Sequence, residues 1–196
     1  MDDVMQPVRR AEEPNRWLEM ASGDDSVVTQ VDDGHPAGPR DGGDLPTSSA
    51  SRPNVVALML KHLNIRGAER VLEIGTGTGW NAALLAHRFG ADRVTTIEVD
   101  PEVAACARTA LAGAGYGAVC VVTGNGAAGY PPRAPYDRVI ATVACRDVPY
   151  AWVAQTRPGG RIVAPSWALD YHGLLLALTV GEDGTAIGHV VDKVSA

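Results

Sequence analysis

The fold is decided by the stretch Val71-Leu72-Glu73-Ile74-Gly75-Thr76-Gly77-Thr78-Gly79-Trp80. Its first four residues predict a short buried strand, three glycines follow at alternate positions, and a helix is expected from residue 80 to about 89. Glycine is needed where the backbone must turn sharply and approach a ligand without a Cβ in the way. The stretch therefore predicts a strand, a ligand-binding loop and a helix in direct succession.

Strands and helices alternate on both sides of this stretch. Nearly all-apolar strands are expected at 70–74, 93–99, 118–123, 137–143 and 161–164, and helices at 54–67, 80–89, 101–113 and 149–156. Two further strands, 174–180 and 186–191, flank Gly-Glu-Asp-Gly and predict a C-terminal antiparallel hairpin. Apolar strands that alternate with helices indicate an α/β fold, an open doubly wound, mostly parallel sheet with helices on both faces. In such a Rossmann-like sheet, ligands bind beyond the carboxyl ends of the strands.

The net charge of −6 is concentrated at the N-terminus. Residues 1–50 carry eleven acidic and four basic residues, whereas the other 146 residues carry twelve acidic and thirteen basic ones. Residues 1–46 are rich in Gly, Pro and Asp and hold too little apolar surface to fold alone. We expect an acidic arm over 1–46, serving as a substrate lid or remaining flexible, and one catalytic domain over 47–196.

The composition excludes several classes of protein. Neither part of the chain has the basic stripe of a nucleic-acid binder, and no apolar run reaches the roughly 18–20 residues that span a bilayer. The N-terminus has no apolar signal core, so a cytoplasmic protein without membrane contact is expected. Three cysteines without a C-x-x-C pair, and five histidines without ligand spacing, predict no metal site and no disulfide framework.

The glycine loop favours one kind of nucleotide over two others. A dinucleotide fingerprint needs G-x-G-x-x-G, but the spacing here is G-x-G-x-G and Trp80 occupies the third glycine's place. A phosphate-binding P-loop is excluded because no Gly-Lys-Ser/Thr follows. Glu98 ends the next strand, 21 residues beyond Gly77, where a carboxylate can accept hydrogen bonds from ribose hydroxyls. A tight turn without a ligand is the alternative.

The segments TSSASRP (47–53), VLEIGTGTGW, IEVD, GNGAAGYP, APYDRVIATVA and VPYAWVAQTRPGGRIVAP occur in one order. The first glycine motif, E-x-G-x-G-x-G, looks like that of the class I S-adenosylmethionine-dependent methyltransferases. Over residues 47–191 the chain resembles the protein-L-isoaspartate O-methyltransferase family. The resemblance implies S-adenosyl-L-methionine as cofactor, S-adenosyl-L-homocysteine as product, and a monomer acting on a peptide or protein that carries Asp or isoAsp.

The resemblance also implies which residues form the site. The cofactor-binding positions are Glu73, Gly75, Thr76, Gly77, Gly79, Glu98, Val99, Asn125, Gly126 and Thr142. The substrate-binding positions are Thr47, Ser48, Ser49, Val143 and Ala144, and the catalytic positions are Ser49 and Arg52. Ser49 would orient the substrate carboxylate, although a Ser before a helix is equally well explained as a helix cap. The small residues after the strand at 137–143 are equally well explained by packing.

The chain departs from the family pattern at several places. Asn125 replaces the usual Asp, Ser51-Arg52-Pro53 replaces Pro-His-x, the acidic arm replaces a longer helical lead, and the closing V-x-F-x-P-L strand is absent. These departures resemble an actinobacterial branch that methylates ordinary aspartate in ribosomally made peptides, after which the ester closes to an aspartimide or rearranges to isoaspartate. The chain stops where relatives continue, and its C-terminus is either naturally short or trimmed.

Three functions follow, and the first is favoured. It is the esterification of a normal aspartate in a ribosomally synthesised, modified peptide. The second is general repair of isoaspartate in damaged proteins. The third is a non-catalytic binding module or a small-molecule methyltransferase. Methylation of nucleic-acid bases is disfavoured because the fourth strand leads into ATVACR rather than a D/N-P-P-Y-type motif.

Overall fold

The computed structural model describes residues 4–36, 41–167 and 173–193. The chain divides into two compact units, Met1–Asn54 and Val55–Ala196, and each is described by itself. The division falls after Asn54, eight residues beyond the boundary expected from the sequence. The segment Thr47–Ser49 thus belongs to the N-terminal unit.

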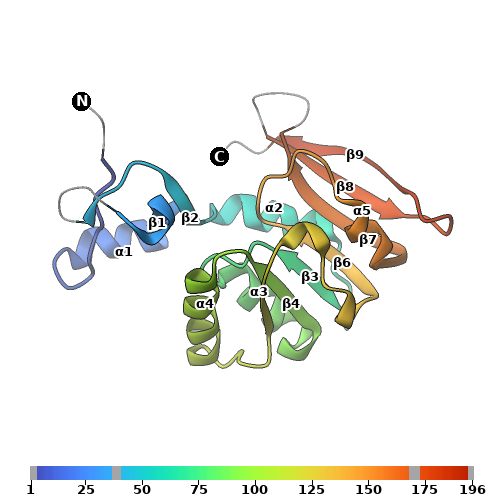
Figure 1. Cartoon of the computed structure of the whole chain (residues 1–196), viewed down its shortest axis with the longest axis horizontal. Coiled ribbons are helices and arrows are strands. Elements are labelled where there is room, and N and C mark those ends of the chain that lie inside the picture. The colour runs from blue at the N-terminus through green and yellow to red at the C-terminus, as the bar shows by residue number, and fades with distance from the viewer. Residues whose placement is uncertain (1–3, 37–40, 168–172, 194–196) are drawn as a thin grey trace. The chain divides into compact units, whose positions relative to one another are not determined.

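The second unit is built on a seven-stranded sheet with the order β5-β4-β3-β6-β7-β8-β9 (Figure 1). The strands are β3 (Val71–Ile74), β4 (Val94–Glu98), β5 (Cys120–Thr123), β6 (Tyr136–Ala141), β7 (Thr156–Ser166), β8 (Leu174–Val180) and β9 (Ala186–Lys193). The first five are parallel to one another. β8 runs antiparallel to β7, and β9 runs antiparallel to β8. This confirms the predicted mostly parallel sheet with a C-terminal hairpin.

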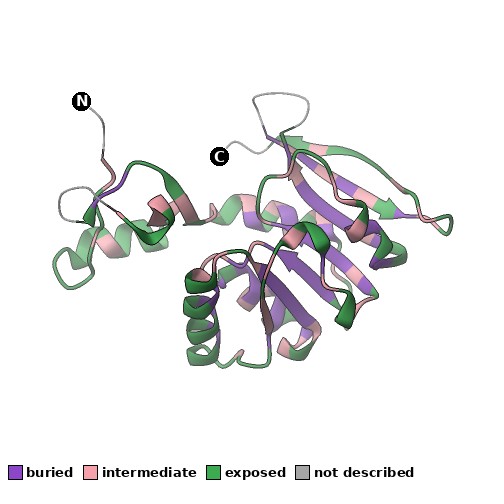
Figure 2. Cartoon of the chain, in the orientation of Figure 1, coloured by how far each residue is buried: buried purple, intermediate pink, exposed green. Residues whose placement is uncertain are grey.

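Helices cover both faces of this sheet. They are α2 (Pro53–Leu63), α3 (Trp80–Phe89), α4 (Pro101–Gly113) and α5 (Tyr150–Ala154). One core layer packs Leu63 of α2 and Leu85 of α3 against Val71 of β3. The other packs Trp152 of α5 against Leu72, the next residue of β3. Because successive residues of a strand point to opposite faces, both faces of β3 are buried, as Figure 2 shows for the central strands.

The predicted bounds of α3 and β8 agree with the structure, whereas β7 begins five residues earlier than expected. Pro158-Gly159-Gly160, which precedes the strand expected at 161–164, is part of β7. Tyr136 of β6 pairs with Thr156 and Arg138 pairs with Arg161, so β7 carries the extra residues of this register shift. Such irregularities are where Pro and Gly are tolerated within sheets.

The N-terminal unit holds α1 (Pro14–Ser22), β1 (Val27–Val31), the 3-10 turn η1 (Asp32–Gly34) and β2 (Pro46–Ala50). β1 and β2 pair antiparallel, and β2 was not predicted from the sequence. The Asp32 carboxylate braces the connection by accepting hydrogen bonds from the backbone N–H groups of Asp44 (3.2 Å) and Leu45 (3.0 Å). Among the described residues, no hydrophobic side chain before Val56 is buried. Hydrogen bonds rather than a hydrophobic core therefore shape this unit.

The start of α2 is capped by a side chain that is distant in sequence. Asp24 Oδ1 accepts a hydrogen bond of 2.9 Å from the backbone N–H of Asn54, in the first turn of the helix. Ser49 lies in β2, four residues before Pro53, so it is not the cap of this helix. No described helix is long and apolar enough to cross a membrane.

Candidate active site

The glycine loop follows β3, at the point where the sheet order reverses. From β3 the chain passes through α3 to β4 on one side, and β6 pairs with β3 on the other side. Gly75, Gly77 and Gly79 have φ angles of 91°, 51° and 81°, a left-handed conformation that side chains disfavour. A Cβ on Gly75 would lie 2.5 Å from Val143 Cγ1. Both conformation and space therefore require glycine where an open α/β sheet binds its ligand.

Glu98, the last residue of β4, ties the loop to the next strand. Its Oε2 atom accepts a hydrogen bond of 2.9 Å from the backbone N–H of Gly77. Its Oε1 atom accepts hydrogen bonds from the N–H groups of Val99 (2.9 Å) and Asp100 (3.3 Å). The carboxylate that was predicted to bind ribose is thus fixed beside the middle glycine.

Glu73 lies beneath the loop and is fully buried. Its Oε1 atom accepts a hydrogen bond of 2.7 Å from the Asn81 amide of α3. Desolvation raises the pKa of Glu73 to about 7, the hydrogen bonds from Thr96 and Asn81 oppose the shift, and the charge of Glu98 adds to it. Glu73 Oε2 and Asn81 Oδ1 are buried without a hydrogen-bond partner. Two buried acceptors beneath the loop therefore lack a donor.

The segment after β6 closes the other side of the loop. The Thr142 hydroxyl donates hydrogen bonds to the carbonyl oxygens of Gly75 (2.6 Å) and Ile74 (3.2 Å). Val143, half exposed, follows it, and Ala144 is exposed. Thr142 thus fixes the backbone of the loop through its hydroxyl group. A residue present only for packing would not need these hydrogen bonds.

Asn125 and Gly126 follow β5 and reach the same edge of the sheet. A Cβ on Gly126 would lie 2.5 Å from Ile74 Cγ2, at the carboxyl end of β3. Asn125 Oδ1 accepts a hydrogen bond of 2.9 Å from the N–H of Ala127, and Trp152 Nε1 donates one of 2.8 Å to the Gly126 carbonyl. The structure therefore brings Asn125, Gly126, Glu73, Glu98 and Thr142 to the edge that holds the glycine loop.

Exposed apolar side chains follow the carboxyl ends of four parallel strands. Trp80 comes after the glycine loop, Val99 after β4, Val143 after β6 and Trp167 after β7. Trp80 is 60% exposed and Val99 72% exposed. The sequence analysis assigned no ligand contact to Trp80, which directly follows the glycine loop, or to Trp167, three residues beyond the strand expected at 161–164. They give this edge an apolar rim that suits ligand contact.

Thr47, Ser48, Ser49 and Arg52 belong to the N-terminal unit. The Thr47 hydroxyl donates to Gln30 Oε1 (2.9 Å), and the Thr29 hydroxyl donates to Ser48 Oγ (3.3 Å). Ser49 is exposed. Arg52 donates to the Asp24 carbonyl (3.2 Å) and lies 3.8 Å from Asp25 Oδ1, an exposed ion pair. Their participation in one site with the glycine loop stays a prediction.

The described ranges indicate neither a metal site nor a nucleophilic thiol. They contain no group of three or more His, Cys, Asp or Glu side chains suited to a metal ion. The Cys145 thiol, near the end of β6, donates to the Pro165 carbonyl (3.3 Å), and burial raises its pKa. A raised pKa disfavours the nucleophilic thiolate, which agrees with a packing role for this cysteine.

The sheet topology, with a glycine loop where the strand order reverses, is that of the class I S-adenosylmethionine-dependent methyltransferase fold. A solved protein-L-isoaspartate O-methyltransferase superposes with a TM-score of 0.77 at 26% identity, covering 91% of this chain and 53% of that one. A Plasmodium falciparum structure, titled a putative protein-L-isoaspartate O-methyltransferase in complex with S-adenosyl-L-homocysteine, has a TM-score of 0.73 at 16% identity, covering 90% and 80%.

The family model "Protein-L-isoaspartate(D-aspartate) O-methyltransferase (PCMT)" matches residues 41–195, and the chain belongs to this family. Curated proteins named protein-L-isoaspartate O-methyltransferase are similar. That of Methanoculleus marisnigri is 49% identical over 59% of this chain and 51% of its own length. One of Anaeromyxobacter sp. is 48% identical over 68% and 63%, respectively. The chain thus spans between half and two thirds of these relatives.

Proposed function

We propose that this chain is an S-adenosyl-L-methionine-dependent carboxyl O-methyltransferase that esterifies isoaspartate in peptides or proteins. The observation that carries the proposal is the contact between the Gly77 N–H and the Glu98 carboxylate within a family match over residues 41–195. The names of the curated relatives favour isoaspartate as the substrate.

The site residues fit the cofactor in charge and shape. S-adenosyl-L-methionine carries a sulfonium and an ammonium cation. The family-implied cofactor positions contribute the Glu98 carboxylate, Glu73 with its raised pKa of about 7, and no cation. The unpartnered acceptors Glu73 Oε2 and Asn81 Oδ1 suit a ligand or water that brings hydrogen-bond donors. Val99, exposed beside Glu98, offers an apolar surface to a base or a ribose.

The chemistry needs little from the protein beyond positioning. When bound, the cofactor supplies an electrophilic methyl group. A carboxylate with an ordinary pKa of about 3.9 is ionised at neutral pH and needs no general base. The protein's part is then to hold the substrate carboxylate in line and to exclude water. In this proposal Ser49 donates a hydrogen bond to that carboxylate, and Arg52 exchanges its exposed pair with Asp25 for it.

A second candidate is the esterification of normal aspartate in a ribosomally made peptide. Two features favour it. The first is that residues 1–40 lie outside the family match; they include α1 and β1, which form the acidic unit together with β2. The Ser51-Arg52-Pro53 segment, where the family pattern has Pro-His-x, also changes the chemistry next to Ser49.

The deciding experiment incubates the full chain with S-adenosyl-L-methionine and matched peptide pairs that differ in Asp or isoAsp at one position. Mass spectrometry follows methyl gain and later loss of methanol. Esterification of linear isoaspartyl peptides supports the first proposal. Esterification confined to normal aspartate in constrained peptides supports the second. Methylation of neither, together with no cofactor binding by calorimetry, would reject both.

Ser49 and Arg52 are tested in the same assay. Ser49→Ala should reduce turnover at unchanged cofactor affinity, and Ser51→Ala is the matched control. Full activity of Ser49→Ala would remove this hydroxyl from the proposal. Arg52→Gln should raise the peptide KM more than it lowers kcat, because the residue is assigned to binding the carboxylate.

A further inference from the structure

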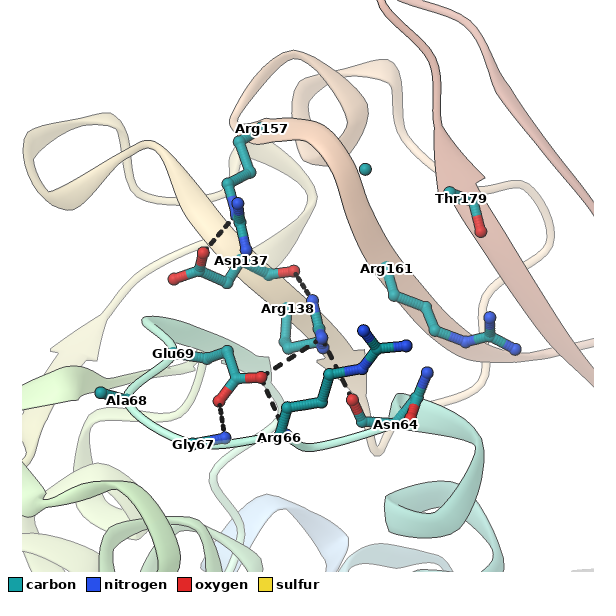
Figure 3. Close-up of a pocket in the computed structure, with 11 residues that line it drawn as sticks. Asn64, Arg66, Gly67, Ala68, Glu69, Asp137, Arg138, Arg157, Arg161 and Thr179 are labelled. Carbon is teal, nitrogen blue, oxygen red and sulfur yellow. Dashed lines mark hydrogen bonds and ion pairs between the residues drawn. The ribbon is translucent and has the colours of Figure 1, made fainter.

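The second unit contains a basic pocket at the edge of the sheet opposite the glycine loop. Its volume is about 610 Å³, within the range of roughly 300–1,000 Å³ typical of small-molecule sites. The loop between α2 and β3, the beginnings of β6 and β7, and the end of β8 form its walls (Figure 3). The strands β3, β6 and β7 start here and carry the candidate active site at their other ends. The pocket is therefore separate from that site.

The sheet register places two arginines side by side in this pocket. Val71 of β3, Arg138 of β6, Arg161 of β7 and Thr179 of β8 are consecutive partners across four strands. Partners in one row point to the same face, and here it is the face covered by α2 and α3, because Val71 packs in that layer. Two like charges in adjacent positions are unfavourable unless something neutralises them.

Arg138 is neutralised by the protein itself. It forms an ion pair of 3.3 Å with Glu69, and the two side chains are 7% and 8% exposed. It also donates to the carbonyl of Asn64 (3.1 Å), a residue with a left-handed φ of 54° just after α2. Glu69 in turn accepts from the backbone N–H groups of Arg66 (2.8 Å) and Gly67 (2.6 Å). A buried pair thus fixes the loop as the wall of the pocket.

Of the other three arginines in the lining, one forms an ion pair and two do not. Arg157 pairs with Asp137. For Arg66 and Arg161, no carboxylate lies within ion-pair distance among the described residues. Arg161 Nε and Arg138 Nε are buried donors without an acceptor. With four arginines against Glu69 and Asp137, the lining carries a net charge of +2.

Two guanidinium groups without an ion pair and a surplus of positive charge in the lining point to an anionic ligand. Guanidinium groups bind phosphate in a fork geometry. A phosphate monoester carries about −1.5 to −2 charges at pH 7, which matches the net charge of the lining. We propose that this pocket binds the phosphate group of a small phosphate monoester between Arg161 and Arg66.

The test measures binding to the full chain by calorimetry, with inorganic phosphate and uridine monophosphate as probes. Uridine monophosphate lacks the adenine that the candidate active site would recognise. Saturable binding is expected, and Arg161→Gln and Arg66→Gln should each weaken it about tenfold or more. Arg88→Gln, an equal charge change at an exposed position in the last turn of α3, is the matched control and should bind as the parent does.

The two probes distinguish the sources of the phosphate. Tighter binding of uridine monophosphate than of inorganic phosphate supports a phosphate monoester, and equal or weaker binding would overturn it in favour of free phosphate. Arg66 is exposed on a loop, so Arg66→Gln decides the matter even where Arg161→Gln impairs folding. Non-saturable binding, equal affinities of Arg66→Gln and Arg88→Gln, or tighter binding of an aspartate hexapeptide than of uridine monophosphate would overturn the proposal.

Discussion

At the scale of single residues, Glu73 combines burial, an incomplete hydrogen-bond set and a place beneath the glycine loop. Its pKa is raised from 4.5 to about 7, so the folded protein binds a proton on this group that the unfolded chain releases at lower pH. The stability that this proton contributes is fully present below pH 4.5 and is lost as the pH rises towards 7. Glu73 is therefore a source of instability at neutral and alkaline pH.

Glu73→Gln should remove this pH-dependent loss. Relative to the parent, the variant should gain about 2–3 kcal/mol of unfolding free energy between pH 4.5 and pH 8, following about 1.4 kcal/mol for each pKa unit. Chemical denaturation at the two pH values measures the gain. Glu182→Gln, in the exposed turn between β8 and β9, is the control. An equal stability difference at both pH values would contradict the assigned pKa.

Glu98 is the residue on which cofactor binding should depend most directly. Glu98→Ala removes the acceptor of the Gly77 N–H and the carboxylate assigned to ribose. A hydrogen bond to a charged group contributes about 1.5–3 kcal/mol, so S-adenosyl-L-homocysteine should bind roughly 10–100-fold more weakly. Calorimetry gives the affinity, and Glu102→Ala on α4 serves as the control. Unchanged affinity of Glu98→Ala would show that the ribose assignment is wrong.

At the scale of elements, the sequence predicted features made by residues close together in the chain and missed those made by residues far apart in it. The strand, glycine loop and helix at 71–89 are local and apolar, and their bounds were predicted correctly. Glu98 ends β4 as expected, whereas its binding of ribose stays a prediction. β2 was missed because Pro-Thr-Ser-Ser-Ala is short and polar, and its pairing with β1 is not visible in local periodicity. The arginine pocket was missed for the same reason, since Arg138, Arg161 and Thr179 become neighbours only through sheet register.

The capping of α2 by Asp24 is another long-range contact with a measurable consequence. Asp24→Ala removes the acceptor of the Asn54 N–H and should destabilise this helix start by about 1 kcal/mol. Hydrogen exchange of the amides at 54–56 measures this locally. Asp25→Ala is the matched control, because its carboxylate is 96% exposed and makes a long ion pair, and it should cost less than about 0.5 kcal/mol. Equal effects of the two variants would reject the cap.

At the scale of the whole molecule, the charge asymmetry follows the division into units. Eight of the eleven acids in residues 1–50 precede Asp33, within α1, β1 and their flanking segments, whereas the core of the second unit begins at Val56. The glycine loop is hydrogen-bonded by the side chains of Glu98 and Thr142, both in the second unit. Cofactor binding and peptide recognition should therefore be separable by deletion.

Deletion of residues 1–40 tests this separation. It removes α1 and β1, leaves β2 without its strand partner, and deletes the Asp24 cap of α2. We expect affinity for S-adenosyl-L-homocysteine within about twofold of the parent, a melting temperature close to that of Asp24→Ala, and loss of peptide methylation, because Ser49 and Arg52 lose the unit that positions them. The double variant Glu12→Gln/Glu13→Gln keeps these elements and reduces the negative charge, so it separates charge from structure. Full methylation by the deleted chain would mean that residues 1–40 take no part in recognising the peptide.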